Sequence, residues 1–61
     1  MTEREMEVLR LMAAGLSNRE IANELVVAVS TVKSHLNHIY GKLDAKNRVQ
    51  AIARGQTLQL L

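Results

Sequence analysis

The sequence predicts an all-α fold, a compact four-helix bundle that contains a helix-turn-helix. Two capping patterns of the Ser/Thr-x-x-Glu type begin at Thr2 and Ser17, and the apolar residues from Val32 onward recur at helical spacing. The valines between Val26 and Val29 have the composition of a strand. No other segment alternates apolar and polar residues, so such a strand would lack a partner. We therefore expect residues 1–61 to form one small helical domain.

The first part of the chain predicts two short helices joined by a sharp turn. The first helix begins at Thr2, whose hydroxyl can accept a hydrogen bond from the backbone N–H of Glu5. It ends at Gly15, which can adopt a left-handed conformation without a Cβ penalty. Ser17 repeats the capping pattern and begins the second helix. The apolar residues expected to pack in the core are Met6, Val8, Leu9, Met12, Ala13, Ile21, Ala22 and Leu25.

A tight connector and a longer helix are predicted next. Val27 is expected to fill the space between the second and third helices, and the third helix is expected from about Thr31 to Leu43. At 100° per residue, this helix has one apolar face and one polar face. The apolar face holds Val32, Leu36, Ile39 and Leu43, and the polar face holds Ser34, Asn37, His38 and Gly41, flanked by Lys33 and Lys42.

The last helix is predicted over residues 48–54, with Asn47 as its N-cap. Gly55 leaves the end of this helix open, and residues 56–61 are expected either to pack back on the bundle through their leucines or to fray. No internal repeat, linker or low-complexity segment is present.

Composition excludes several classes of protein. The chain has no cysteine, so disulfides and thiolate metal sites are excluded. No apolar run approaches the roughly 20 residues of a membrane span, and the first five residues are too charged for a signal peptide. We therefore expect a soluble cytoplasmic protein with no membrane partner, no metal and no cofactor.

The charges are unevenly distributed along the chain. Residues 1–29 hold three arginines and five glutamates, a net charge of −2, whereas residues 30–61 hold five lysines or arginines and one aspartate, a net charge of +4. No Asp or Glu occurs from Leu25 to Leu43. A helix that presents hydrogen-bonding groups and cations without carboxylates suits the major groove of DNA. The alternative for this face, a solvated surface, more often mixes both signs of charge.

Five segments of the chain resemble the LuxR-type helix-turn-helix domain of bacterial transcription regulators, and together they span most of its length. These segments are Thr2–Glu5, Val8–Leu11, Gly15–Ala22, Ser30–Leu36 and Asn47–Arg48. Tyr40–Leu43 and Gln50–Arg54 are most similar to the large, ATP-dependent, MalT-like regulators. In those proteins this domain is the C-terminal domain. The resemblance implies a fragment of a larger regulator that binds double-stranded DNA and regulates transcription.

The resemblance also implies roles for individual residues. The helix from about Thr31 to Leu43 is the recognition helix, which lies in the major groove. The positions that face base edges are Lys33, Ser34 and Asn37. The positions near phosphates are Asn18, Arg19, Ser30, Thr31, His35, Lys42 and Arg48. RNA polymerase is a possible further partner, which the parent protein would contact.

Two residues depart from the family pattern. Asn37 stands where some members have Lys, which exchanges a cation for an amide suited to adenine. Ala28 stands where the family often has a Ser or Thr that caps the recognition helix. Loss of that cap would cost about 1 kcal/mol, unless Ser30 takes its place and the helix starts two residues later.

Catalytic and metal-binding functions are less consistent with the sequence than DNA binding. Ser34 and His38 are four residues apart and can meet on one helix face, but no third residue orients the imidazole, so an enzyme is not expected. His35 and His38 fall short of the three or four ligands of a zinc site. The main alternative is a helical protein–protein interaction module without DNA binding.

The fourth helix carries the surface on which that alternative depends. Ala51, Ile52 and Ala53 could seat another helix, although Val49 and Ile52 are more simply explained as closing the core. We expect the free domain to be a monomer or weak dimer that pairs on DNA. The residues expected at the pairing contact are Val49, Ile52, Ala53 and Gln56.

Overall fold

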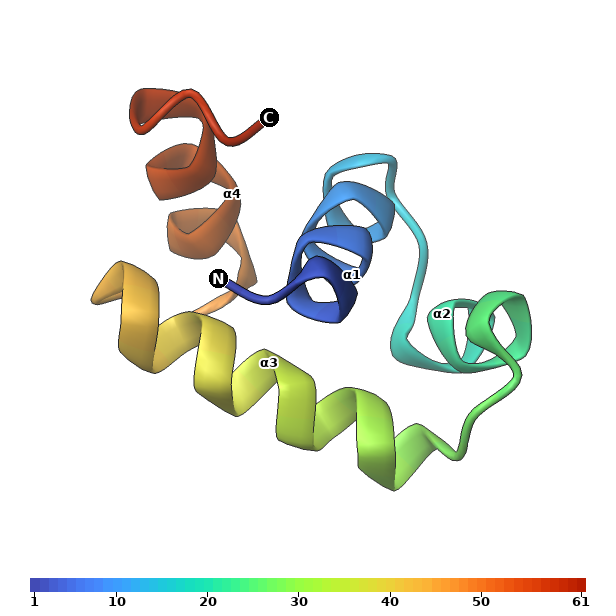
Figure 1. Cartoon of the computed structure of the whole chain (residues 1–61). Coiled ribbons are helices and arrows are strands. Elements are labelled where there is room, and N and C mark those ends of the chain that lie inside the picture. Colours follow the sequence, from blue (N-terminus) through green and yellow to red (C-terminus); the bar gives the residue numbers. More distant parts are fainter.

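The computed structural model describes all 61 residues and contains four α-helices and no strand, which confirms the predicted fold class (Figure 1). The helices are α1 (Glu3–Ala13), α2 (Asn18–Leu25), α3 (Val29–Leu43) and α4 (Arg48–Thr57). Both α1 and α3 pack against each of the other helices, whereas α2 and α4 do not pack against one another. None of the four helices has the combination of length and apolar character needed to cross a membrane.

Three of the four helices begin as predicted. At α1, Glu5 N donates to Thr2 Oγ1 over 3.1 Å, and Thr2 N donates to Glu5 Oε1 over 2.9 Å. The same reciprocal pair joins Ser17 and Glu20 at α2, with distances of 3.2 and 2.8 Å. At α4, Asn47 Oδ1 accepts from Gln50 N over 2.9 Å. Each cap satisfies backbone donors that have no partner within the helix.

The predicted start of the third helix is wrong. Helix α3 begins at Val29, two residues before Thr31, and its N-cap is Ala28, which makes no side-chain capping bond. The backbone N–H groups of Thr31 and Val32 both donate to Ala28 O, over 3.0 and 3.2 Å. Ser30 is therefore inside the helix and does not take over as its cap. The side chain of Val29 packs on the core, which favours the earlier start.

A residue in the left-handed conformation lies just beyond the last residue of each helix. The backbone N–H of the next residue donates a hydrogen bond to a carbonyl in the last turn of the helix, which is the pattern of a Schellman motif. The left-handed residues are Gly15, Val26, Asp44 and Gln59. The apolar residues that follow them, and that pack on the core, are Leu16, Val27, Ala45 and Leu60. The packing of Val27 agrees with the predicted connector.

Val26 is the strained member of this set. Its φ of 57° and ψ of 50° are unfavourable for a β-branched residue, because the Cβ crowds the backbone. The residue is 89% exposed, so little packing is present to offset the strain.

The core is built from apolar residues of all four helices. Its buried members are Val8, Leu9, Met12, Ile21, Ala22, Val32, Leu36, Ile39, Leu43 and Ala51. Full burial of one of the larger side chains contributes about 1.5–3 kcal/mol. Ala13, which was expected in the core, is exposed.

Helix α4 differs from its prediction in length and in the residues that it buries. It continues through Gly55 to Thr57. Gly55 is buried, and a Cβ at this position would lie 3.0 Å from Leu61 Cδ1 and 3.2 Å from Leu9 Cδ2. Leu61 therefore lies against Gly55, and Leu60 packs on the core. The C-terminal residues pack back on the bundle, which was one of the two predicted outcomes.

Candidate nucleic-acid interface

Helix α3 separates its apolar and polar residues as the helical wheel predicts. Val32, Leu36, Ile39 and Leu43 are buried against the other helices. The polar residues on the opposite face are exposed: Ser30, Thr31, Lys33, Ser34, Asn37, His38 and Lys42. The buried face fixes the helix on the bundle, so the polar face points outward as a rigid surface.

The three residues predicted to read bases lie in the first half of this surface. Lys33, Ser34 and Asn37 are all exposed, and Ser34 and Asn37 are close to one turn apart. None of the ion pairs in the structure involves Lys33. The three side chains together offer an ammonium, a hydroxyl and an amide, which can hydrogen-bond to base edges.

Three of the residues predicted to contact phosphate lie on the same helix as that trio, and a fourth lies on α2. Ser30 and Thr31 are exposed in the first turn of α3, and His35 is half-buried on the same helix. Arg19 is exposed in the first turn of α2. Hydroxyl, imidazole and guanidinium groups are all suited to phosphate oxygens.

Two other residues predicted to contact phosphate are bonded to each other. Arg48 Nη2 donates to Asn18 Oδ1 over 2.9 Å, and Arg48 Nη1 donates to Leu16 O over 2.6 Å. Arg48 therefore links the starts of α2 and α4, two helices that do not pack together. A guanidinium has five N–H donors, so a phosphate contact by Arg48 remains a prediction that is compatible with this link.

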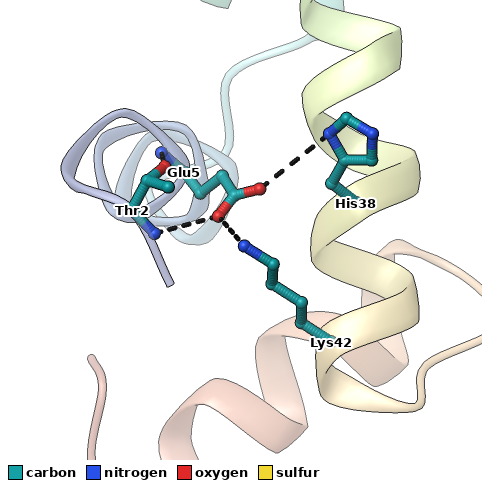
Figure 2. A network of polar contacts seen from close by, with 4 residues as sticks. All are labelled: Thr2, Glu5, His38 and Lys42. Carbon is teal, nitrogen blue, oxygen red and sulfur yellow. Dashed lines mark hydrogen bonds and ion pairs between the residues drawn. The ribbon is translucent and has the colours of Figure 1, made fainter.

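Lys42, the remaining residue predicted to contact phosphate, forms an ion pair with a buried glutamate. Lys42 Nζ donates to Glu5 Oε1 over 2.7 Å, and the carboxylate also accepts from Thr2 N over 2.9 Å (Figure 2). His38 Nδ1 lies 4.0 Å from Glu5 Oε2. The ammonium of Lys42 and the backbone N–H of Thr2 lower the pKa of Glu5 from 4.5 to about 2, against the opposing effect of burial.

The sequence pattern predicts only the capping role of Glu5. A signal for the second role was present, because Glu5, Val8, Leu9 and Met12 follow the i, i+3, i+4, i+7 spacing of one helix face. A carboxylate on the buried face of a helix needs a cation or several hydrogen bonds. The sequence did not indicate which cation, because Lys42 is 37 residues away along the chain.

The residues predicted to form a pairing contact lie along α4. Val49, Ala53 and Gln56 are exposed, and Ile52 is half-buried and packs on the core. Val49 is 76% exposed, so the preferred explanation that it closes the core is wrong. Ala51 is fully buried and cannot belong to a small-residue side that seats another helix.

No group of three or more His, Cys, Asp or Glu side chains comes together in a way that could hold a metal ion.

Comparison with known proteins identifies the family of the chain. Residues 1–54 match the family model described as "Bacterial regulatory proteins, luxR family". The response regulator protein VraR of Staphylococcus aureus is 48% identical over 52 residues, which are 85% of this chain and 25% of that protein. VraR of Staphylococcus saprophyticus and VraR of Staphylococcus epidermidis match with the same identity and coverage. The chain thus spans about a quarter of the length of these relatives.

A solved structure agrees with the family match. The crystal structure of the response regulator ChrA in a heme-sensing two-component system superposes with a TM-score of 0.96 and is 43% identical. The match covers 98% of this chain and 30% of that chain.

These comparisons confirm the predicted LuxR-type domain and correct its predicted subfamily. The relatives are response regulators, so the prediction of a MalT-like regulator is wrong. The family is not enzymatic, which confirms that this chain is not an enzyme. The chain belongs to the luxR family of bacterial regulatory proteins, as a LuxR-type helix-turn-helix DNA-binding domain of the kind found in transcription regulators.

Proposed function

We propose that this domain binds double-stranded DNA in a sequence-specific manner, with α3 in the major groove, as part of a bacterial response regulator that controls transcription in the cytoplasm. The observation that carries the proposal is the exposed polar face of α3, which has no carboxylate of its own and is held outward by four buried apolar residues. Lys33, Ser34 and Asn37 read base edges, and the residues predicted near phosphates fix the register.

Titration of random-sequence duplex at several salt concentrations tests DNA binding itself. A DNA-binding domain loses affinity steeply as salt rises, because cations on the protein release counterions from the phosphates. A protein–protein interaction module shows no such dependence. Affinity that is absent at low salt, or indifferent to salt, would contradict the proposal.

Two lysine variants test the orientation of α3. Lys33→Ala should weaken binding to the preferred site by about 1–3 kcal/mol and reduce discrimination among sequences. Lys42→Ala should weaken binding similarly on every sequence and lower the magnitude of the salt slope by about one. Competition between cognate and scrambled duplexes measures both effects. If Lys33→Ala leaves the ratio of specific to non-specific affinity unchanged, Lys33 does not contact base edges.

Pairing on DNA is proposed through α4. The exposed residues Val49, Ala53 and Gln56 follow helical spacing and form a small patch with Ile52. One short helix is too small to supply the roughly 800 Å² per partner of a standard stable interface. Two half-sites on one duplex raise the effective concentration of one copy for the other, so a small contact becomes sufficient.

The pairing proposal is tested with and without DNA. Sedimentation of the free domain should give mostly monomer, and a duplex with two half-sites should bind two copies cooperatively. Ala53→Glu should remove the cooperativity and leave the affinity for a single half-site nearly intact. A tight dimer of the free domain would contradict the pairing proposal, and so would cooperativity that substitutions in α4 do not change.

Any contact with RNA polymerase is proposed only for the parent protein.

A further inference from the structure

Glu5 belongs to α1 and places a carboxylate at the edge of the polar face of α3, next to Lys42 and His38. The residue is 4% exposed and lies on the same helix face as Val8, Leu9 and Met12. A buried carboxylate is costly unless it is paired and hydrogen-bonded. Its partners are therefore fixed parts of the structure.

The two oxygens of Glu5 face two residues of α3 that are one turn apart. Oε1 accepts from Lys42 Nζ over 2.7 Å, and Oε2 lies 4.0 Å from His38 Nδ1, as Figure 2 shows. The side chains of Lys42 and His38 remain 47% and 66% exposed. Their outer sides are thus available to a partner that covers the polar face of α3.

The ion pair changes the charge that this end of α3 presents. Lysine has three N–H donors, and the bond to Glu5 uses one of them. The other donors of Lys42 can reach a phosphate, but that phosphate would lie within two hydrogen-bond lengths of the Glu5 carboxylate. The pair of Lys42 and Glu5 has a net charge of zero, so its attraction for DNA is weaker than that of an isolated lysine.

We propose that Glu5 is a positioning residue for DNA binding, which holds the Lys42 ammonium in place and, as a built-in counter-charge, lowers the affinity for phosphate on every sequence alike. This inference rests on the proposed binding of DNA by α3. The attraction for phosphate is independent of sequence, so Glu5 leaves the choice of site to Lys33, Ser34 and Asn37.

The test is a cycle of variants at the two positions, measured as affinity against salt concentration. Glu5→Gln keeps an oxygen that can accept from Thr2 N and Lys42 Nζ and changes the charge of the pair from zero to +1. Affinity for cognate and random duplexes should rise by the same factor, roughly three- to tenfold at about 0.1 M salt, and the magnitude of the salt slope should rise by about one. Lys42→Gln should lower the slope by about one, and the double variant should return it close to that of the native domain.

Glu7→Gln is the matched control, because Glu7 is an exposed glutamate of the same helix that pairs with Arg4 at 3.5 Å. This variant removes the same charge from the domain without changing the pair at Lys42. It should alter DNA affinity much less than Glu5→Gln, since charges more than about 8 Å apart are screened at physiological salt.

The possible outcomes separate the inference from the proposed function. If the native domain shows no salt-dependent DNA binding, the proposed function fails. If the native domain binds but folded Glu5→Gln has unchanged or lower affinity, or an effect that Glu7→Gln reproduces, the inference alone is wrong. Circular dichroism establishes folding of each variant. If Glu5→Gln does not fold, the salt dependence of DNA binding by Lys42→Gln is the test. A salt slope equal to that of the native domain overturns the inference.

Discussion

The two ends of α3 are built differently. At its leading end, the helix follows a strained Val26 and an N-cap, Ala28, that makes no side-chain bond, and Lys33 forms no ion pair. At its trailing end, Lys42 is bonded to the buried Glu5, and the chain leaves through a left-handed Asp44. The leading end is free to meet a ligand, whereas the trailing end is tied to the bundle.

This difference shows how one helix can serve both recognition and stability. The side chains that are proposed to read bases lie where few internal contacts would have to be broken. The side chains that join the helix to α1 lie one to two turns later. Substitution of Lys33 should therefore affect binding with little effect on stability, whereas substitution of Lys42 should affect stability as well as binding. The following predictions test that difference and the way in which the leading end is built.

The largest difference is expected between two lysines of the same helix. Lys42→Met removes the cation from Glu5 and should lower the free energy of unfolding by about 1–3 kcal/mol, because a buried carboxylate loses a charge-assisted hydrogen bond. Lys33→Met should change it by less than about 0.5 kcal/mol, since Lys33 is exposed and unpaired. Urea unfolding of both variants measures the difference. Equal losses would show that the two ends of α3 are not divided in this way.

Acid should reveal the same ion pair in the unsubstituted domain. The folded-state pKa of Glu5, about 2, is below its ordinary value of 4.5, so the unfolded chain binds the proton first. The contribution of the charged Glu5 to the free energy of unfolding is therefore complete above about pH 4.5, and it is lost as the pH falls through 2. The pKa of the exposed Glu20 is also lowered, by the backbone N–H of Ser17, and acts in the same direction.

Comparison with Glu5→Gln isolates the contribution of Glu5 from that of Glu20. The difference in the free energy of unfolding between the native domain and this variant should shrink steadily between pH 4.5 and pH 2. A difference that is constant over this range would mean that the carboxylate is not held in its charged form by Lys42.

A smaller effect is expected from restoring a cap at the leading end. Ala28 has the extended backbone of an N-cap, with φ −73° and ψ 152°, and lacks only a side-chain acceptor. Ala28→Ser should raise the free energy of unfolding by about 1 kcal/mol. The control is Ser17→Ala, which removes an existing cap from α2 and should cost a similar amount. No gain from Ala28→Ser would indicate that the first turn of α3 is already satisfied in another way.

The smallest effect is expected from relieving the strain before α3. Asn adopts the left-handed conformation more readily than Val, so Val26→Asn should stabilise the domain by about 0.5–1 kcal/mol. Val27→Asn is the control and should destabilise it, because Val27 packs on the core. Thermal unfolding at neutral pH measures both. A loss of stability in Val26→Asn would mean that the exposed valine makes a contact that offsets its strain.

The fold was predictable from sequence wherever its determinants are local. The capping bonds of Thr2, Ser17 and Asn47 each join residues three apart, so they are visible as short patterns. The start of α3 was misplaced because Ala28 gives no such pattern. Gly15 marked the end of α1, whereas Val26 did not mark the end of α2, because a β-branched residue is not expected in a left-handed conformation.

The candidate site was predictable in its outline and not in its internal bonds. The spacing of Val32, Leu36 and Ile39 was enough to define the exposed face of α3. The bonds from Lys42 to Glu5 and from Arg48 to Asn18 join residues 37 and 30 positions apart, and no local pattern specifies such pairs. The exposure of Val49 and the burial of Ala51 also depended on how α4 rotates against α1 and α3.

The four left-handed helix ends have a consequence for how quickly the domain forms. At each of them, a backbone hydrogen bond joins residues five positions apart, and the apolar residue that donates this bond packs on the core. Contacts that are this close in sequence need little loop closure before they form. Proteins rich in local contacts fold in microseconds to milliseconds. We therefore expect the domain to fold fast, and to regain the exposed polar face of α3 rapidly after any transient unfolding.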